Sequence, residues 1–192
     1  MFILSCGRVW TKLYKRSFLL KNNIRFIEHK KFEDNPYLPI LMSYSPRVGK
    51  VQECLYHYIY NPDSTSRKKN DYLVFNRIDT AEYLFDQVII RNKYREYKWE
   101  FDAVFIGLYY VNTVITCWMK FDKPEFNYIR KVYYGIRNKI PQYKLNPYIK
   151  QSPKYYRYIV KMNIWELKIV SLFIKWLIKI VGKEKITAVM KR

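Results

Sequence analysis

From residue 70 onward, apolar residues recur along the chain at alternating intervals of four and three. The first such series consists of Val74, Ile78, Ala81, Phe85 and Val88. This spacing puts one apolar side chain on each turn of a single helix face, and such a face needs a partner that covers it. The pattern therefore predicts that residues 70–190 are mostly helical and pack against one another.

Residues 103–119 form a long stretch without a charged side chain. They include Tyr109, Asn112 and Thr113, whose polar groups are unfavourable in lipid. We therefore interpret this stretch as a helix buried in the protein core. A further helix is expected to start at Asp122, which with Glu125 forms a capping-box pattern.

The last predicted helix begins at a second capping-box pattern, Asn163 with Glu166, and runs to Val181, with Gly182 as its stop. Its polar residues fall on one narrow face, and apolar residues cover much of the rest. The polar ones are Lys168, Ser171, Lys175 and Lys179. One interpretation is a helix that lies in a membrane surface; the other is a packed helix whose lysine stripe faces solvent.

The N-terminal third has a different pattern. Residues Val48 to Tyr60 alternate and are rich in β-formers, which predicts a strand or the edge of a hairpin, and Ile24 to Ile27 read as a short extended piece. We therefore expect an α/β protein dominated by helices. In this interpretation residues 1–69 form a partial α/β layer, and residues 70–192 form a helical region.

Four short motifs occur in the stretch from residue 10 to residue 67. They read Trp-Thr-Lys-Leu-Tyr, Phe-Glu-Asp-Asn, Leu-Tyr-His-Tyr and Asn-Pro-Asp-Ser-Thr-Ser-Arg. In this order and spacing they resemble the acceptor-side half of bacterial family 2 glycosyltransferases. Those enzymes have a GT-A fold and build capsular polysaccharide, exopolysaccharide or lipopolysaccharide from nucleotide-sugars.

The residues themselves place Glu33 and Asp34 at a helix start, with Asp34 or Asn35 as the N-cap and Pro36 in the first turn. Inverting sugar transfer needs a carboxylate that removes a proton from the acceptor hydroxyl. The resemblance implies that Asp34 is this base and that Glu33 supports it. The alternative is that the acidic pair only caps a helix.

The resemblance also implies a set of substrate-binding residues. Trp10 would pack beside the active-site floor and Lys12 would face substrate phosphate or sugar, the alternative being a buried Trp anchor with a solvated Lys. The other three residues would bind the donor diphosphate. The set consists of Trp10, Lys12, Ser64, Ser66 and Arg67. Hydroxyl groups and a guanidinium suit phosphate oxygens, although the same loop also reads as an ordinary surface turn.

The sequence has no Asp-x-Asp motif and no glycine-rich loop. The enzymes that the four motifs resemble bind their nucleotide on an N-terminal half that ends in such a motif. The resemblance therefore implies that this chain is the C-terminal portion of a longer transferase, truncated or split, whose partner would be an N-terminal half. A divalent metal, Mg²⁺ or Mn²⁺, is expected for the complete enzyme and not for this chain alone. Transfer by the chain alone is not expected.

Charge is unevenly distributed along the chain. Residues 1–119 hold 18 Lys and Arg against 12 Asp and Glu, a net +6, whereas residues 120–192 hold 18 against 4, a net +14. An RNA-binding module would explain a total of +20, but no RNA-binding signature occurs, so we expect no nucleic acid partner. The charge favours an anionic membrane surface.

The cysteines bear on the compartment. Three cysteines without a Cys-x-x-Cys pair are typical of a reducing cytoplasm. We expect a cytoplasmic protein that is peripheral at the inner face of the cell membrane. The alternative to a transferase is a basic peripheral membrane-interaction protein without catalysis.

Overall fold

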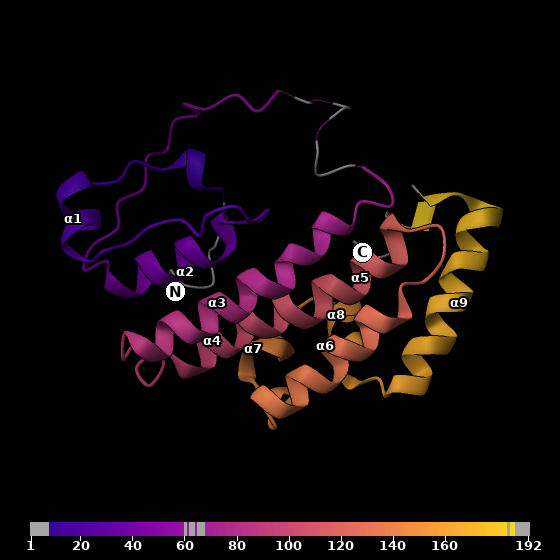
Figure 1. Cartoon of the computed structure of the whole chain (residues 1–192). Helices are drawn as coiled ribbons and strands as arrows, with labels where there is room; N and C mark the ends of the chain where they lie inside the picture. Colours follow the sequence, from indigo (N-terminus) through magenta and orange to yellow (C-terminus); the bar gives the residue numbers. More distant parts are fainter. Residues whose placement is uncertain (1–7, 60, 62–63, 65–67, 184, 187–192) are drawn as a thin grey trace.

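The computed structural model of the chain describes residues 8–59, 61, 64, 68–183 and 185–186, and helices make up its ordered elements (Figure 1). The α-helices are α1 (Arg16–Lys21), α2 (Asp34–Tyr44), α3 (Asn76–Ile90), α4 (Lys98–Phe105), α5 (Asn112–Lys120), α6 (Phe126–Lys139), α7 (Pro147–Lys150), α8 (Lys154–Lys161) and α9 (Ile164–Val181). Three 3-10 segments are η2 (Val9–Thr11), η4 (Tyr72–Phe75) and η6 (Tyr143–Leu145), and η5 (Ile106–Val111) is a π-helix.

The expected α/β layer is wrong, because no β-strand occurs among the residues that the structure describes. Residues 46–59 have no regular secondary structure and are exposed, and Ile24–Ile27 are likewise not a strand. A strand is stable only when its backbone groups pair with a neighbouring strand. β-forming side chains alone do not supply that neighbour, so the segment crosses the top of Figure 1 as an open, extended connection.

The centre of the helical region is one continuous helix built from α4, η5 and α5. Its core side chains are fully buried, among them Phe105, Ile106 and Tyr110. Lys98–Lys120 is long and apolar enough to cross a membrane by length and composition, and 67% of the most apolar part is buried inside the protein. The prediction of a core helix over residues 103–119 is confirmed by this burial.

The other helices cover this central helix. α3 and α6 pack along η5, and α9 packs against α5 and α6. Val74, Ile78, Ala81 and Val88 are buried as their spacing predicts, and the helical character expected for residues 70–190 is confirmed within the described positions. The start of α6 differs from the prediction: it begins at Phe126.

Asp122 does not start α6 because it is engaged elsewhere. Its backbone N–H donates to Asn70 Oδ1, and its carboxylate accepts a hydrogen bond of 2.8 Å from Asn70 Nδ2. These contacts fix the turn after α5 to the segment that precedes η4. The capping-box pattern therefore predicts the start of α6 one turn too early.

The N-terminal part packs on the helical region through α2, which lies against α3. Tyr37 and Leu38 of α2 share a core cluster with Leu84 of α3 and Phe101 of α4. The division of the chain at residues 69 and 70 stays a prediction. This cluster holds α2, which carries Asp34 in its first turn, against the rest of the protein.

Candidate functional site

The predicted acidic pair lies at the start of α2. Asp34 is the first residue of the helix, Glu33 occupies the N-cap position, and Pro36 lies in the first turn. The location of the carboxylates at a helix N-terminus is thus confirmed, although the N-cap is Glu33 rather than Asp34 or Asn35. The Glu33 side chain makes no capping hydrogen bond, so its carboxylate is not used to hold the helix start.

The environment of Asp34 makes its carboxylate more basic. Asp34 is half-buried, and burial, with the nearby Glu33 carboxylate, raises its pKa, while the amides of Asp34 and Asn35 oppose the shift. Phe32, two residues before Asp34, has φ of +69°, a left-handed conformation that is rare for an aromatic residue. The guanidinium of Arg77 lies 4.5 Å from the centre of the Phe32 ring and holds it there.

The predicted substrate-binding residues are only partly brought together. Trp10 is partly exposed and stacks on Tyr58 at 6.5 Å, so the first and third motifs meet. Lys12 Nζ donates to the Arg8 carbonyl at 2.9 Å, within its own segment. The backbone N–H of Ser64 donates to the carbonyl of Asn61 at 3.3 Å. Two other predicted residues, at positions 66 and 67, lie outside the described part of the chain.

Metal chemistry has no visible site in the described residues. Within them, no three His, Cys, Asp or Glu side chains lie close enough together to hold a metal ion. The carboxylates of Glu33 and Asp34 are the two acidic groups at the start of α2, and they would need a further ligand from elsewhere. The metal expected for a complete transferase stays a prediction.

α9 has the boundaries that its sequence predicts. Asn163 Oδ1 accepts hydrogen bonds from the amides of Trp165 and Glu166 at 2.9 and 3.0 Å, and Glu166 Oε2 accepts from the Asn163 amide at 2.6 Å. The helix ends at Val181, followed by Gly182 with φ of +86°. The capping box and the glycine stop are therefore confirmed.

The polar stripe of α9 faces inward in its middle. Ser171 Oγ accepts a hydrogen bond of 2.7 Å from the indole N–H of Trp118. Lys175 is buried and donates to the backbone carbonyls of Trp118 and Phe121, at the end of α5. Burial lowers the pKa of Lys175. The interpretation of this stripe as the solvated face of a packed helix is therefore wrong for Ser171 and Lys175.

The outward side of α9 is apolar. Six large side chains of this face are more than half exposed: Trp165, Ile169, Leu172, Phe173, Trp176 and Ile180. Their spacing places them on one continuous arc of the helix, with Lys168 and Lys179 at its edge. We call these six side chains the α9 apolar face. In Figure 1, α9 is the outermost helix on the right, at the surface of the bundle.

A second surface feature is a groove of about 340 Å³ between the central helix and α7 and α8. Ala103, Val104 and Leu108 line one wall, Ile149 and Tyr156 line the other, and further polar side chains complete the lining. The π-helix η5 forms part of the first wall, and such interruptions are frequent at functional sites. We call this feature the α4–α7 groove.

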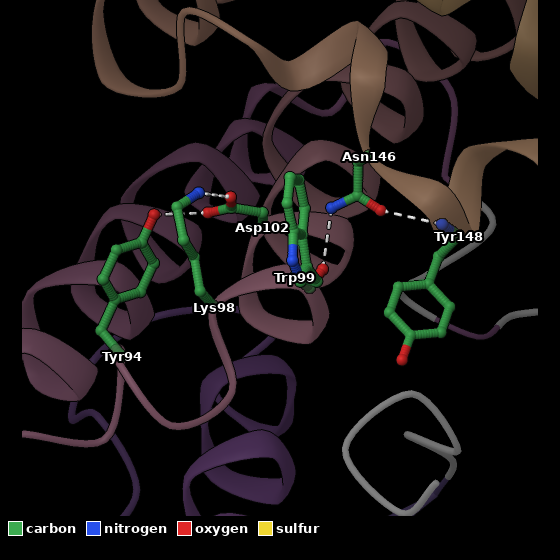
Figure 2. A network of polar contacts seen from close by, with 6 residues as sticks. All are labelled: Tyr94, Lys98, Trp99, Asp102, Asn146 and Tyr148. Carbon is green, nitrogen blue, oxygen red and sulfur yellow. Dashed lines mark hydrogen bonds and ion pairs between the residues drawn. The ribbon is translucent and has the colours of Figure 1, made fainter.

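A polar network fixes the two walls of this groove (Figure 2). Buried Asn146 donates to the backbone carbonyl of Trp99 at 2.8 Å and accepts from the backbone N–H of Tyr148 at 3.0 Å, which caps α7. The hydroxyl of Tyr148 donates to Glu100 at 2.5 Å. Next to these residues, buried Asp102 accepts hydrogen bonds from Tyr94 and Lys98.

Sequence reasoning missed this groove. In the sequence, the prolines at and around residues 143–152 are typical of a connector, whereas in the structure this segment contains η6 and α7. The Asn146-Pro147 pair was the available signal, because Asn is a preferred N-cap and Pro a preferred first helical residue. The groove itself is assembled from elements some 40 residues apart in sequence.

Comparisons with protein-family models, with curated proteins and with solved structures found no match to this chain. The resemblance to family 2 glycosyltransferases therefore stays a prediction that rests on the four motifs.

Proposed function

We propose that this protein binds anionic membrane surfaces peripherally, through the α9 apolar face. The observation that carries the proposal is the outward direction of six large apolar side chains on one helix. Contiguous exposed apolar patches of this kind mark interaction sites. Because Ser171 and Lys175 satisfy their polar groups inside the bundle, the outward face is left without polar residues along its centre.

The composition of the α9 apolar face suits a lipid interface. Trp165 and Trp176 are residues that prefer the boundary between lipid headgroups and acyl chains. Burying a large apolar side chain completely contributes about 1.5–3 kcal/mol, and each of these side chains is more than half exposed. The face as a whole therefore offers roughly 6 kcal/mol or more before the losses that association imposes.

Charge favours a bilayer of anionic lipid as the occupant. Residues 154–183 contain seven Lys and Arg and one acidic residue, a net +6. Lys168 is exposed, and its ammonium lies 5.8 Å from the centre of the Trp165 ring. A lysine at the edge of an apolar face can keep its stem on that face while its ammonium contacts lipid phosphate. Each such contact contributes about 1 kcal/mol at an anionic surface.

Flotation with lipid vesicles tests the proposal. Protein is mixed with vesicles of phosphatidylcholine alone or of phosphatidylcholine with phosphatidylserine, at low and at high salt. We expect flotation with the anionic vesicles and partial release at high salt, because salt screens the lysines and leaves the apolar contribution. Equal flotation with both kinds of vesicle, or none with either, would contradict the proposal.

Sugar transfer is a second candidate function, favoured by the position of Asp34. A half-buried carboxylate with a raised pKa suits a general base. In such a reaction Asp34 would take the proton of an acceptor hydroxyl. The hydroxyl oxygen would attack the anomeric carbon of the donor sugar, and the nucleoside diphosphate would leave. This chain would supply the acceptor side, and a nucleotide-binding half would come from another polypeptide.

A fusion experiment tests this second candidate. The chain is joined to the N-terminal nucleotide-binding half of a complete family 2 glycosyltransferase, and transfer of a labelled sugar is measured. Asp34→Asn should abolish transfer, because an amide cannot take the proton, whereas Asp86→Asn on the exposed side of α3 should leave it unchanged. An inactive fusion, or an active Asp34→Asn fusion, would rule the candidate out.

A further inference from the structure

We infer that the α4–α7 groove binds a neutral sugar ring. The inference starts from an observation about charge: none of the described residues that line the groove is ionisable as an acid or a base at neutral pH. The chain as a whole has 36 Lys and Arg. A hollow without a single lysine or arginine in its lining is therefore a local exception to the surface around it.

The neutral lining selects the charge of the ligand. An ion that enters a partly buried groove loses hydration, and it needs a counter-charge or several hydrogen bonds to replace it. The carboxylate of Glu100 already accepts a hydrogen bond from Tyr148, a residue of the lining. A neutral ligand meets no such requirement, so the groove suits a neutral molecule better than a phosphate or a carboxylate.

The polar side chains of the lining suit the hydroxyl groups of a sugar. Asn112 and Gln151 have exposed side-chain amides, which both donate and accept hydrogen bonds. Burial raises the pKa of Tyr156, so its hydroxyl stays protonated and can also donate or accept. A polyol needs partners of both kinds, and these three residues of the groove lining provide them from α5, from the end of α7 and from α8.

The apolar lining and the size agree with a sugar of one or two rings. Val104 and Leu108 give one wall an apolar surface, on which the C–H face of a pyranose can lie. The volume of about 340 Å³ is at the low end of the range for small-molecule sites, about 300–1,000 Å³. Because Asn146 links α4 to α7, the walls are held in place before a ligand arrives, which favours binding.

Gly107 is part of the groove lining and presents no side chain there. A Cβ atom added there would lie 3.5 Å from the hydroxyl of Tyr156, an ordinary contact distance. Alanine therefore fits at this position and narrows the groove by one methyl group. A leucine side chain at the same place would fill much of it.

Saturation-transfer NMR with the whole chain tests the inference. The probes are glucose and maltose as neutral sugars, glucose 6-phosphate as a charged sugar, and indole as a neutral aromatic. We expect signals from the neutral sugars and weaker binding of glucose 6-phosphate, despite the net charge of the protein. Asn112→Ala should raise the Kd for maltose about tenfold, the effect of one lost hydrogen bond.

Two further variants separate a groove effect from a folding effect. Gly107→Leu should remove the maltose signal, whereas Gly107→Ala should weaken it and keep the thermal stability of the parent protein. Asn127→Ala on the exposed side of α6 is the matched control and should change nothing. Absence of sugar signals, tighter binding of glucose 6-phosphate, or binding of indole alone would overturn the inference. None of these outcomes depends on α9 or on Asp34.

Discussion

Replacing one residue of the α9 apolar face should weaken membrane binding by a predictable amount. Ile169 is 67% exposed in the free protein, and complete burial of such a side chain contributes about 1.5–3 kcal/mol. About two thirds of that, roughly 1–2 kcal/mol, is available on contact with lipid. Ile169→Gln removes this contribution and adds an amide that lipid does not solvate. We therefore expect the apparent affinity for the vesicles to fall at least about tenfold.

The assay is flotation with vesicles of phosphatidylcholine and phosphatidylserine over a range of lipid concentrations. The matched control is Ile90→Gln, because Ile90 is 71% exposed and is the last residue of α3. Both substitutions lie on the surface, so both variants should keep the stability of the parent protein within about 0.5 kcal/mol. Equal loss of binding in both variants would show that general hydrophobicity, and not the α9 apolar face, is responsible. Unchanged binding of Ile169→Gln would refute the reasoning.

Three other predictions concern charge and stability. Lys168→Gln should lower the affinity for anionic vesicles about fivefold at low salt, equivalent to about 1 kcal/mol. Lys21→Gln in α1 is the control and should leave the affinity unchanged. Flotation measures both. Lys175→Met should lower the free energy of unfolding in urea by about 1–3 kcal/mol, because two carbonyls at the end of α5 lose their donor; exposed Lys179→Met should change it by less than about 0.5 kcal/mol. Burial raises the folded-state pKa of Asp34, so its ionised form opposes folding once the pH exceeds the ordinary value of 3.8. Asp34→Asn should therefore raise the melting temperature at pH 7, and this gain should vanish as the pH falls to about 3.8; a gain that is independent of pH would contradict it.

Helices were predictable from the sequence where the apolar spacing and the caps agreed. Ile78 and Ala81 are buried at the positions that a 3.6-residue period assigns to them, and Asn163 and Gly182 delimit α9 as expected. Both signals are local, because they depend only on residues within one helix. Both signals can therefore be recognised in the sequence without knowledge of tertiary contacts.

The predicted strand failed because its stability depends on a partner. Leu55 and Ile59 have suitable side chains, but they are 77% and 84% exposed in the structure. Sequence alone indicates a preference for extended backbone, whereas pairing is decided by whether another strand lies beside it. Within the described part of the chain no such strand exists.

The sequence also did not predict which face of α9 packs against the bundle. Its helical pattern separates a polar stripe from an apolar face but does not say which side meets the bundle. The indole N–H of Trp118 and the open carbonyls at the end of α5 decide this, because Ser171 and Lys175 satisfy them. The candidate site on α9 was thus predicted as a helix, while its outward apolar face became evident only from these contacts.

The most direct test of the membrane proposal is quenching of tryptophan fluorescence by vesicles whose acyl chains carry bromine. Trp165 and Trp176 lie on the α9 apolar face and are 70% and 56% exposed. We predict strong quenching in the parent protein with anionic vesicles. In the variant with Trp165→Phe and Trp176→Phe, flotation should persist, because phenylalanine keeps the face apolar, and quenching should be lost. Absence of quenching in the parent protein, or equal quenching in the variant, would contradict the proposal that this face enters the membrane.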